Sequence, residues 1–227
     1  MKIQLNRRIC VLGQKKTKPS WNQNEPSVTT DLNGDFIGWP HCRQNLEFFV
    51  SRHINIQTFL SFVFLNTCFA KPLIVAHRGA SFDAPENTLP AFELAWEQGA
   101  DAIEGDFLLT KDKQIVCIHD HSTKRLADRN LEVKSSTLAE LKSLDVGFWK
   151  DKKYKNTRIP TLAEVFATIP DGKKIFVEIK CGTEIIPFLI HEIEKSGLHE
   201  ERIVIICFKH EVIQALKNQA PQYIAHW

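Results

Sequence analysis

The sequence lacks the cysteine patterns of a zinc-binding module. Its six cysteines include no CxxC pair, and none has a cysteine or histidine at the spacing of a zinc finger. Three lie in residues 1–71, and the other three lie in or beside expected strands of the remaining chain. We therefore expect buried thiols that form neither disulfides nor a metal site.

The sequence also lacks long apolar runs, and residues 72–227 lack an excess of positive charge. The apolar run at 59–65 is shorter than the roughly 20 residues that a membrane-spanning helix needs. Residues 72–227 contain 20 Lys and Arg against 23 Asp and Glu, whereas residues 1–71 contain 9 against 4. A slightly acidic body lacks the positive face that binds phosphate backbones. We expect no nucleic-acid partner and no stable membrane span in the mature protein.

Residues 1–71 differ in character from the rest of the chain. Residues 1–53 show no sustained helical or strand periodicity, so we expect a disordered or spurious N-terminal extension. Residues 54–70 follow a basic pair, have an apolar centre and end on small residues at Cys68 and Ala70, which is typical of a signal peptide. If this segment acts as a signal peptide, the protein is expected to be periplasmic or secreted. If it does not, the protein is expected to be cytoplasmic. The alternative is a buried or interfacial helix in a genuine extension.

Residues 72–227 alternate between expected strands and helices. The strands are Leu73–Ala76, Ala102–Leu109, Ile115–His119, Lys174–Lys180, Ile203–Phe208 and Tyr223–Trp227. The helices are Thr88–Gly99, Leu138–Leu144, Leu162–Ile169, Ile186–Ser196 and Glu211–Asn218. Strands that are separated by helices pair in parallel, so this pattern predicts an α/β domain.

Charged and titratable residues gather at the ends of the first four strands. They are His77 and Arg78 after the first, Glu104 and Asp106 in the second, His119 at the end of the third, and Glu178 and Lys180 in the fourth. Residues two apart on a strand share a face. The C-terminal ends of parallel strands carry the active site in a (β/α)₈ barrel or an open α/β sheet. The sequence therefore predicts one site built from these seven residues.

Three of the seven are carboxylates. Glu104, Asp106 and Glu178 would repel one another unless a cation lay between them. Oxygen ligands without cysteine suit one divalent cation, Mg²⁺ or Ca²⁺, better than zinc. An ordinary exposed strand face is the alternative, but apolar neighbours make the strand Ala102–Leu109 a buried one.

The other four residues suit phosphate chemistry. Arg78 can hold phosphate oxygens in a bidentate fork and Lys180 adds a point charge. His77 and His119 can serve as general base and general acid, in either order. Taken singly, each histidine could equally be a hydrogen-bonded structural residue. Together the set predicts metal-dependent attack on a phosphodiester.

Seven short motifs resemble those of the glycerophosphodiester phosphodiesterase family, in the same order and at similar spacings. They are AHRGA at 76–80, PENT at 85–88, EGD at 104–106, HD at 119–120, TLAEL at 137–141, IPTL at 159–162 and VEIK at 177–180. The resemblance implies a TIM-type (β/α)₈ barrel over residues 72–227. It also implies hydrolysis of small glycerophosphodiesters, such as glycerophosphocholine or glycerophosphoethanolamine, to glycerol 3-phosphate and an alcohol in lipid and glycerol metabolism.

The resemblance also implies roles for the site residues. Glu104, Asp106 and Glu178 correspond to the metal ligands, His77 and His119 to the acid–base pair, and Arg78 and Lys180 to the phosphate-binding residues. A barrel of this type has eight strands in about 250 residues, whereas residues 72–227 offer about six in 156. We expect a C-terminally incomplete barrel.

Two other functions fit the same residues. A related phospholipase D-like enzyme would act on intact lipids and would show a larger apolar surface around the site, of which the sequence gives no obvious sign. A non-catalytic remnant would follow from the missing strands, although the intact set of seven residues disfavours it.

Overall fold

The computed structural model describes the backbone of Ile9–Leu12 and the whole of residues 72–227. Ile9–Leu12 form a strand that the sequence did not suggest. The rest of the expected extension over 1–53 and the signal-like segment 54–70 lie outside the described residues, so both expectations stay predictions.

The described strands form one sheet. They are β1 (Ile9–Leu12), β2 (Leu73–His77), β3 (Ala102–Leu109), β4 (Ile115–Cys117), β5 (Lys174–Ile179), β6 (Ile203–Ile206) and β7 (Ile224–His226). Six of them lie side by side in the order β1-β2-β3-β5-β6-β7, and every neighbouring pair in this order is parallel. The parallel α/β sheet predicted from the sequence is confirmed.

Strand β4 corrects one prediction. We expected a parallel strand over Ile115–His119, but β4 ends at Cys117 and runs antiparallel to β3. Five residues separate the two strands, and a parallel return needs a crossover of a dozen residues or more. The connection is instead a tight turn in which the Thr110 N–H donates to the Gln114 carbonyl at 2.9 Å.

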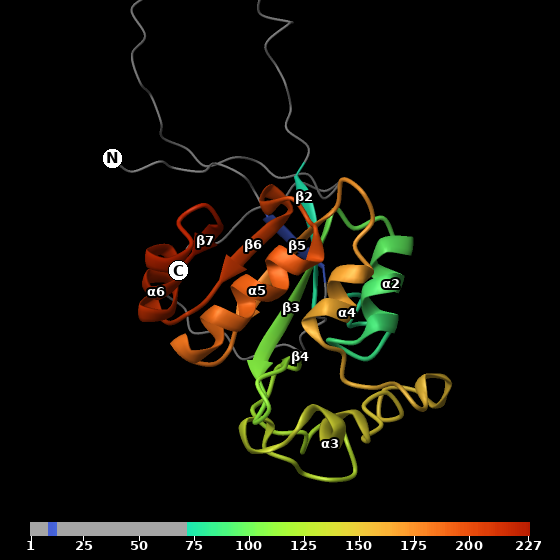
Figure 1. Ribbon diagram of the computed structural model, residues 1–227. Coiled ribbons are helices and arrows are strands. Elements are labelled where there is room, and N and C mark those ends of the chain that lie inside the picture. The colour runs from blue at the N-terminus through green and yellow to red at the C-terminus, as the bar shows by residue number, and fades with distance from the viewer. Residues whose placement is uncertain (1–8, 13–71) are drawn as a thin grey trace, which may run out of the picture. The chain divides into compact units, whose positions relative to one another are not determined.

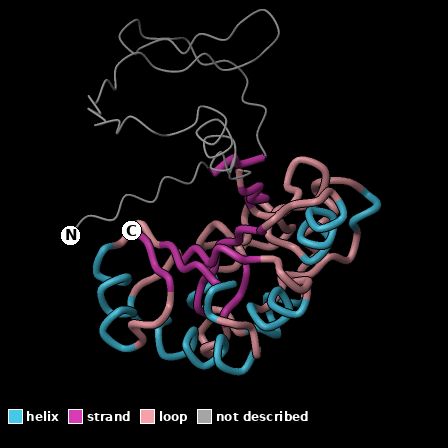
Figure 2. The backbone as a smooth tube through the Cα atoms, turned by 90° about the horizontal axis from the view of Figure 1, so that it is seen from above, coloured by secondary structure: helices cyan, strands magenta, loops and turns pink. Residues whose placement is uncertain are grey.

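The helices are α2 (Leu89–Glu97), α3 (Leu138–Lys142), α4 (Leu162–Ala167), α5 (Ile186–Ser196) and α6 (His210–Gln219). Of these, α2, α4, α5 and α6 contact one another in turn and line the outer side of the strands (Figures 1 and 2). Helix α3 lies apart from them, beyond the C-terminal end of β3 (Figure 1). Among the described residues, no helix has the length and apolar character needed to cross a membrane.

The main core lies between the sheet and its outer helices. Phe92 from α2 and Leu189 from α5 are fully buried in the same apolar cluster as Ile103 of β3. A second cluster joins β4 to the segment that follows it, with Val116 and Leu141 as members. Residues 119–160 therefore fold as a packed extension on the C-terminal side of β3 and not as a loose loop.

Gly79 lies at the turn between β2 and α2, and it allows a close approach of these two elements. Its φ is +74°, and a Cβ there would meet the carbonyl carbon and oxygen of Ala91 at 2.6 and 2.7 Å. We expect Gly79→Ala to lower the free energy of unfolding by about 3 kcal/mol, because it combines a left-handed backbone with a backbone clash.

Gly172→Ala is the matched control for this prediction. Gly172 has nearly the same φ, +75°, but a Cβ there has no neighbour within 4 Å. Its cost should be about 1 kcal/mol, from backbone conformation alone. Urea unfolding of both variants measures the difference, and equal costs would mean that the contact with Ala91 is unimportant.

Candidate active site

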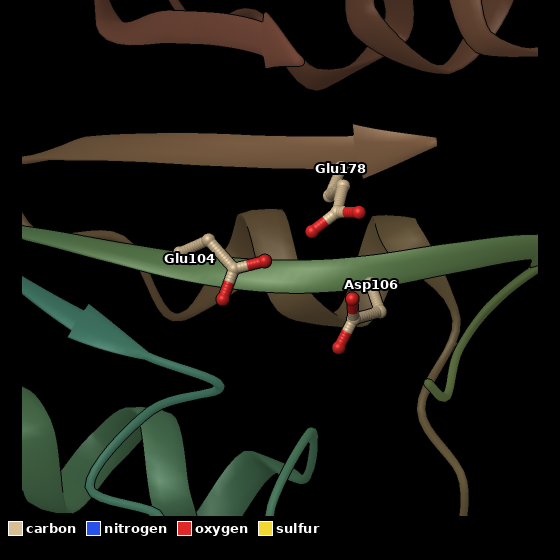
Figure 3. A group of neighbouring side chains, drawn as sticks. All are labelled: Glu104, Asp106 and Glu178. Atoms are coloured by element: carbon tan, nitrogen blue, oxygen red, sulfur yellow. The ribbon is translucent and has the colours of Figure 1, made fainter. Parts of the chain in front are cut away.

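Strand register brings the three predicted carboxylates together. Glu104 and Asp106 point to one face of β3, and Glu178 on β5 pairs directly with Asp106. Their oxygens lie within 4.8 Å of one another, and all three residues are buried. Figure 3 shows the three carboxylates gathered around β3, with Glu178 on the side of β5 and Asp106 on the opposite side.

The end of β2 completes one side of this cluster. His77 pairs with Glu104 across the β2–β3 ladder, and its Nε2 lies 3.8 Å from Glu104 Oε2. Arg78 follows with a positive φ of 58°, and its backbone N–H donates to the same Glu104 oxygen at 3.0 Å. Burial lowers the pKa of His77, with a further contribution from the charge of Arg78.

Two cations lie against the carboxylates. Arg78 Nε is 3.1 Å from Asp106 Oδ2. Lys180 Nζ donates to Glu178 Oε1 at 2.8 Å and lies 3.5 Å from Asp106 Oδ1. Although burial opposes it, the hydrogen bond with Glu178 and the charge of Asp106 raise the pKa of Lys180. The site thus holds three negative groups and two positive ones.

Glu104 carries the imbalance of charge. Burial raises its pKa to about 8, and the charges of Asp106 and Glu178 add to this effect. Its Oε1 is buried and accepts no hydrogen bond from any described residue. An unsatisfied carboxylate oxygen that faces two further carboxylates fits a divalent cation, which prefers oxygen ligands of this kind. The geometry of the three expected ligands therefore fits one divalent cation.

The raised pKa predicts how the stability of the metal-free protein depends on pH. Because the folded-state pKa lies above the ordinary value of 4.5, protonated Glu104 favours folding. This stabilisation is complete below pH 4.5 and is lost as the pH rises through about 8. Between pH 6 and pH 8.5 we expect a loss on the order of 2 kcal/mol in the free energy of unfolding, measured by urea unfolding in a chelator.

Glu104→Gln supplies the control for the pH prediction. The amide is neutral and nearly isosteric, so the variant should lose most of this pH dependence and be the more stable protein at pH 8.5. An unchanged slope in the variant would assign the dependence to another group.

A second layer of polar groups holds Asp106. Asn87, which has a φ of +57°, donates through Nδ2 to Asp106 Oδ2 at 2.8 Å. Its Oδ1 in turn accepts from the Asp106 N–H at 3.1 Å and from the Cys117 thiol at 3.3 Å. Burial raises the pKa of Cys117 well above its usual range, and the charge of Asp106 adds to this. The thiol is therefore a neutral donor, as is expected of a buried cysteine without a disulfide.

His119 reaches the site by a different route from the one predicted. It follows the antiparallel strand β4, and the Ile118 N–H donates to the Asp106 carbonyl at 2.9 Å. That bond returns the chain to the C-terminal end of β3. The Nδ1 atom of His119 lies 2.6 Å from Asp120 Oδ1, so Nδ1 is the ring nitrogen that faces Asp120.

A chain of ion pairs connects His119 to Arg78. Asp120 Oδ2 accepts from Arg125 Nε at 2.9 Å, and the two Nη atoms of Arg125 donate to Glu86 at 3.1 and 2.7 Å. Glu86 Oε1 also accepts from Arg78 Nη1 at 3.1 Å. Arg125 thereby joins the histidine on one side of the site to the arginine on the other.

The structure brings six of the seven predicted residues into direct contact and places His119 at the same end of the sheet. Sequence reasoning gave no role to Glu86, Asn87, Asp120 or Arg125. The PENT motif at 85–88 is the one signal that could have pointed to Glu86 and Asn87. No spacing pointed to Arg125, because its partners lie 5 and 39 residues away.

Comparison with known proteins now identifies the family. The model of the Glycerophosphoryl diester phosphodiesterase family matches residues 77–225, a range that contains all seven predicted site residues. The chain belongs to this family. A relative named glycerophosphodiester phosphodiesterase, from Caldanaerobacter subterraneus subsp. tengcongensis, is 42% identical over 155 residues, which cover 66% of this chain and 64% of that protein.

Solved structures of the family show the same fold. A phosphodiesterase of Oleispira antarctica, in complex with the product sn-glycerol-3-phosphate, is 31% identical with a TM-score of 0.65 and covers 68% of this chain and 64% of that one. A glycerophosphodiester phosphodiesterase of Agrobacterium tumefaciens is 29% identical with a TM-score of 0.62, at 67% and 65% coverage. The predicted TIM-type barrel class is confirmed. The chain spans less than two thirds of the length of each of these proteins.

Proposed function

We propose that this protein hydrolyses glycerophosphodiesters to glycerol 3-phosphate and an alcohol, with one divalent cation, Mg²⁺ or Ca²⁺. The observation that carries the proposal is the buried cluster of Glu104, Asp106 and Glu178, which lies between Arg78 and Lys180. Family membership supports it, as does the product found in the Oleispira antarctica relative.

The charges of the site match a phosphodiester. When Glu104 is ionised, three carboxylates and two cations leave one negative charge, which would repel a phosphodiester anion. A divalent cation held by the carboxylates would change this to one positive charge, and it would also neutralise charge on the phosphate and polarise its P–O bond. The metal-loaded site would then attract the single negative charge of the substrate.

The protein's own side chains would bind the phosphate and move the protons. Arg78 and Lys180 present N–H donors for the non-bridging phosphate oxygens. His77, whose pKa is lowered by burial, is neutral near pH 7 and would take the proton from the attacking water. His119 would give a proton to the oxygen of the departing alcohol through Nε2, because Nδ1 is engaged with Asp120.

One assay tests the proposal. The full chain is incubated with glycerophosphocholine and Mg²⁺ or Ca²⁺, and glycerol 3-phosphate is measured with a coupled dehydrogenase. We expect release that stops on addition of EDTA and returns with excess metal. Equal turnover in EDTA would contradict the metal role, and a folded protein without turnover in either metal would favour the non-catalytic alternative.

One observation favours a second candidate, a phospholipase D-like activity on lipids that carry an acyl chain. The sequence gave no sign of apolar surface near the site, yet Phe82, Phe148 and Trp149 are exposed, and Phe82 follows Arg78 by only four residues. Turnover of lysophosphatidylcholine and glycerophosphocholine, compared in one assay, separates the two substrates. Preference for the acylated substrate would favour this second candidate.

A further inference from the structure

Three exposed aromatic side chains lie in two loops beside the candidate active site. Phe82 is 62% exposed, Phe148 51% and Trp149 43%. Phe82 lies in the loop between β2 and α2, whose Ser81 hydroxyl donates to the His77 carbonyl at 2.8 Å. The other two belong to the segment between α3 and α4. Large aromatic side chains that stay in water on a folded surface are typical of a binding surface.

The two loops are held together, so the three aromatics form one surface. Lys150 Nζ donates to the Ser81 carbonyl at 2.8 Å and lies 5.8 Å from the centre of the Trp149 ring. The Tyr154 hydroxyl donates to the Asp83 carbonyl at 2.9 Å. These contacts place Phe82 and Trp149 on neighbouring loops with a fixed relation to each other.

The same surface carries positive charge. The run from Phe148 to Lys155 holds four lysines and one aspartate, and Lys152, Lys153 and Lys155 are exposed. Phe148 and Trp149 also line a hollow of about 550 Å³, in which the cations Arg125, Lys155 and Arg158 outnumber the carboxylates Asp128 and Asp145. The Lys155 ammonium makes no hydrogen bond or ion pair with another described residue, so it is available to an anion that enters the hollow.

We propose that this aromatic–lysine surface, formed by Phe82, Phe148, Trp149, Lys152, Lys153 and Lys155, docks the protein on an anionic phospholipid surface. Aromatic rings prefer the boundary between headgroups and acyl chains, and lysines around them are attracted to anionic headgroups. A nucleic acid is a less suitable partner, because residues 72–227 are slightly acidic and so lack the extended basic face that binds a phosphate backbone. Docking here would bring the mouth of the candidate site close to the lipid surface.

Segment-resolved hydrogen exchange of the full chain tests the proposal. The protein is mixed with vesicles of phosphatidylcholine alone, or of an equimolar mixture of phosphatidylcholine and phosphatidylglycerol. We expect amides in 80–84 and 146–156 to exchange at least several-fold more slowly with the mixed vesicles. High salt should remove this protection, because the attraction is electrostatic. Segment resolution separates this surface from contacts made elsewhere in the chain.

A pair of charge-reversal variants sharpens the test. Lys152→Glu combined with Lys155→Glu should abolish the protection, whereas Lys134→Glu with Lys195→Glu makes the same change of net charge at exposed lysines outside both segments and should keep it. Retention of the protein's native exchange pattern without vesicles shows that each variant is folded. Phe148→Ser with Trp149→Ser should also lose the protection.

Three results would overturn the proposal. These are no protection of the two segments on mixed vesicles, equal protection on vesicles of phosphatidylcholine alone, and protection that survives the Lys152 and Lys155 reversal. None of these measurements needs turnover. The docking proposal can therefore be contradicted while the proposed hydrolysis holds, and the hydrolysis can be contradicted while the docking proposal holds.

Discussion

Asp106→Asn should lower turnover of glycerophosphocholine by about 10³-fold or more. Asp106 is the fully buried member of the carboxylate cluster, and its oxygens also meet Arg78 and Lys180. The amide removes one charged metal ligand and turns a donor toward two cations, which disfavours both metal binding and phosphate binding. The kcat, the KM and the metal dependence of the variant measure this effect.

Two further measurements make the Asp106 prediction specific. Asp171→Asn, an equal change of charge at an exposed residue whose nearest cation is Arg202 at 3.7 Å, should leave turnover unchanged. Isothermal titration with Mg²⁺ or Ca²⁺ should show metal binding to the parent chain and little to Asp106→Asn. If the variant bound metal as tightly as its parent, Asp106 would not be a ligand.

His119→Ala should lower kcat by about 10³-fold, and Asp120→Asn by about 10²-fold, with smaller changes in KM. The Asp120 carboxylate accepts the Nδ1–H of His119 at 2.6 Å, which leaves Nε2 as the nitrogen that we propose transfers the proton. Asparagine can donate as well as accept, which permits the wrong tautomer. The nitrogen chemical shifts of the imidazole report the tautomer directly, without an activity assay.

Arg125 provides a graded test of the same arrangement. Arg125→Ala removes the partner of Asp120 and Glu86. We expect its kcat to lie between the kcat of the parent and that of Asp120→Asn. Arg125→Lys keeps the charge but cannot donate to both carboxylates in the same fork, so it should recover part of the loss. Full activity in Arg125→Ala would show that Asp120 orients His119 without help.

The clustering of Glu104, Asp106, Glu178 and Lys180 could be predicted because their spacing reflects strand geometry. Glu104 and Asp106 are two apart in an apolar strand, as are Glu178 and Lys180, and alternation alone puts each pair on one face. The alternation of strands and helices predicted the parallel sheet in the same way. Helix α5 shows how far this local reasoning goes, because its bounds, Ile186–Ser196, match those expected from a stop at Gly197.

The sequence did not predict the direction of β4, the existence of β1 or the gathering of the exposed aromatic residues. The apolar run at Ile115–His119 indicated a strand but not its direction, and the short turn from β3 forced an antiparallel return. Strand β1 depends on pairing with β2, some 64 residues further on, and nothing local marked it. The gathering of exposed aromatic residues near Arg78 was also not predicted, because Phe82 and Trp149 are 67 residues apart in the sequence.

The sequence by itself determined the residue types of the site, the strand ends that carry them and the likeness to a phosphodiesterase family. These depend on short-range periodicity and on motifs that are read along the chain. Only the tertiary structure decided that Glu178 lies opposite Asp106 and that Asn87 and Cys117 support Asp106. It also decided that Arg125 connects His119 to Arg78. Such contacts depend on strand register and on the packing of distant segments, and the energy of a buried charge is set by all its neighbours at once.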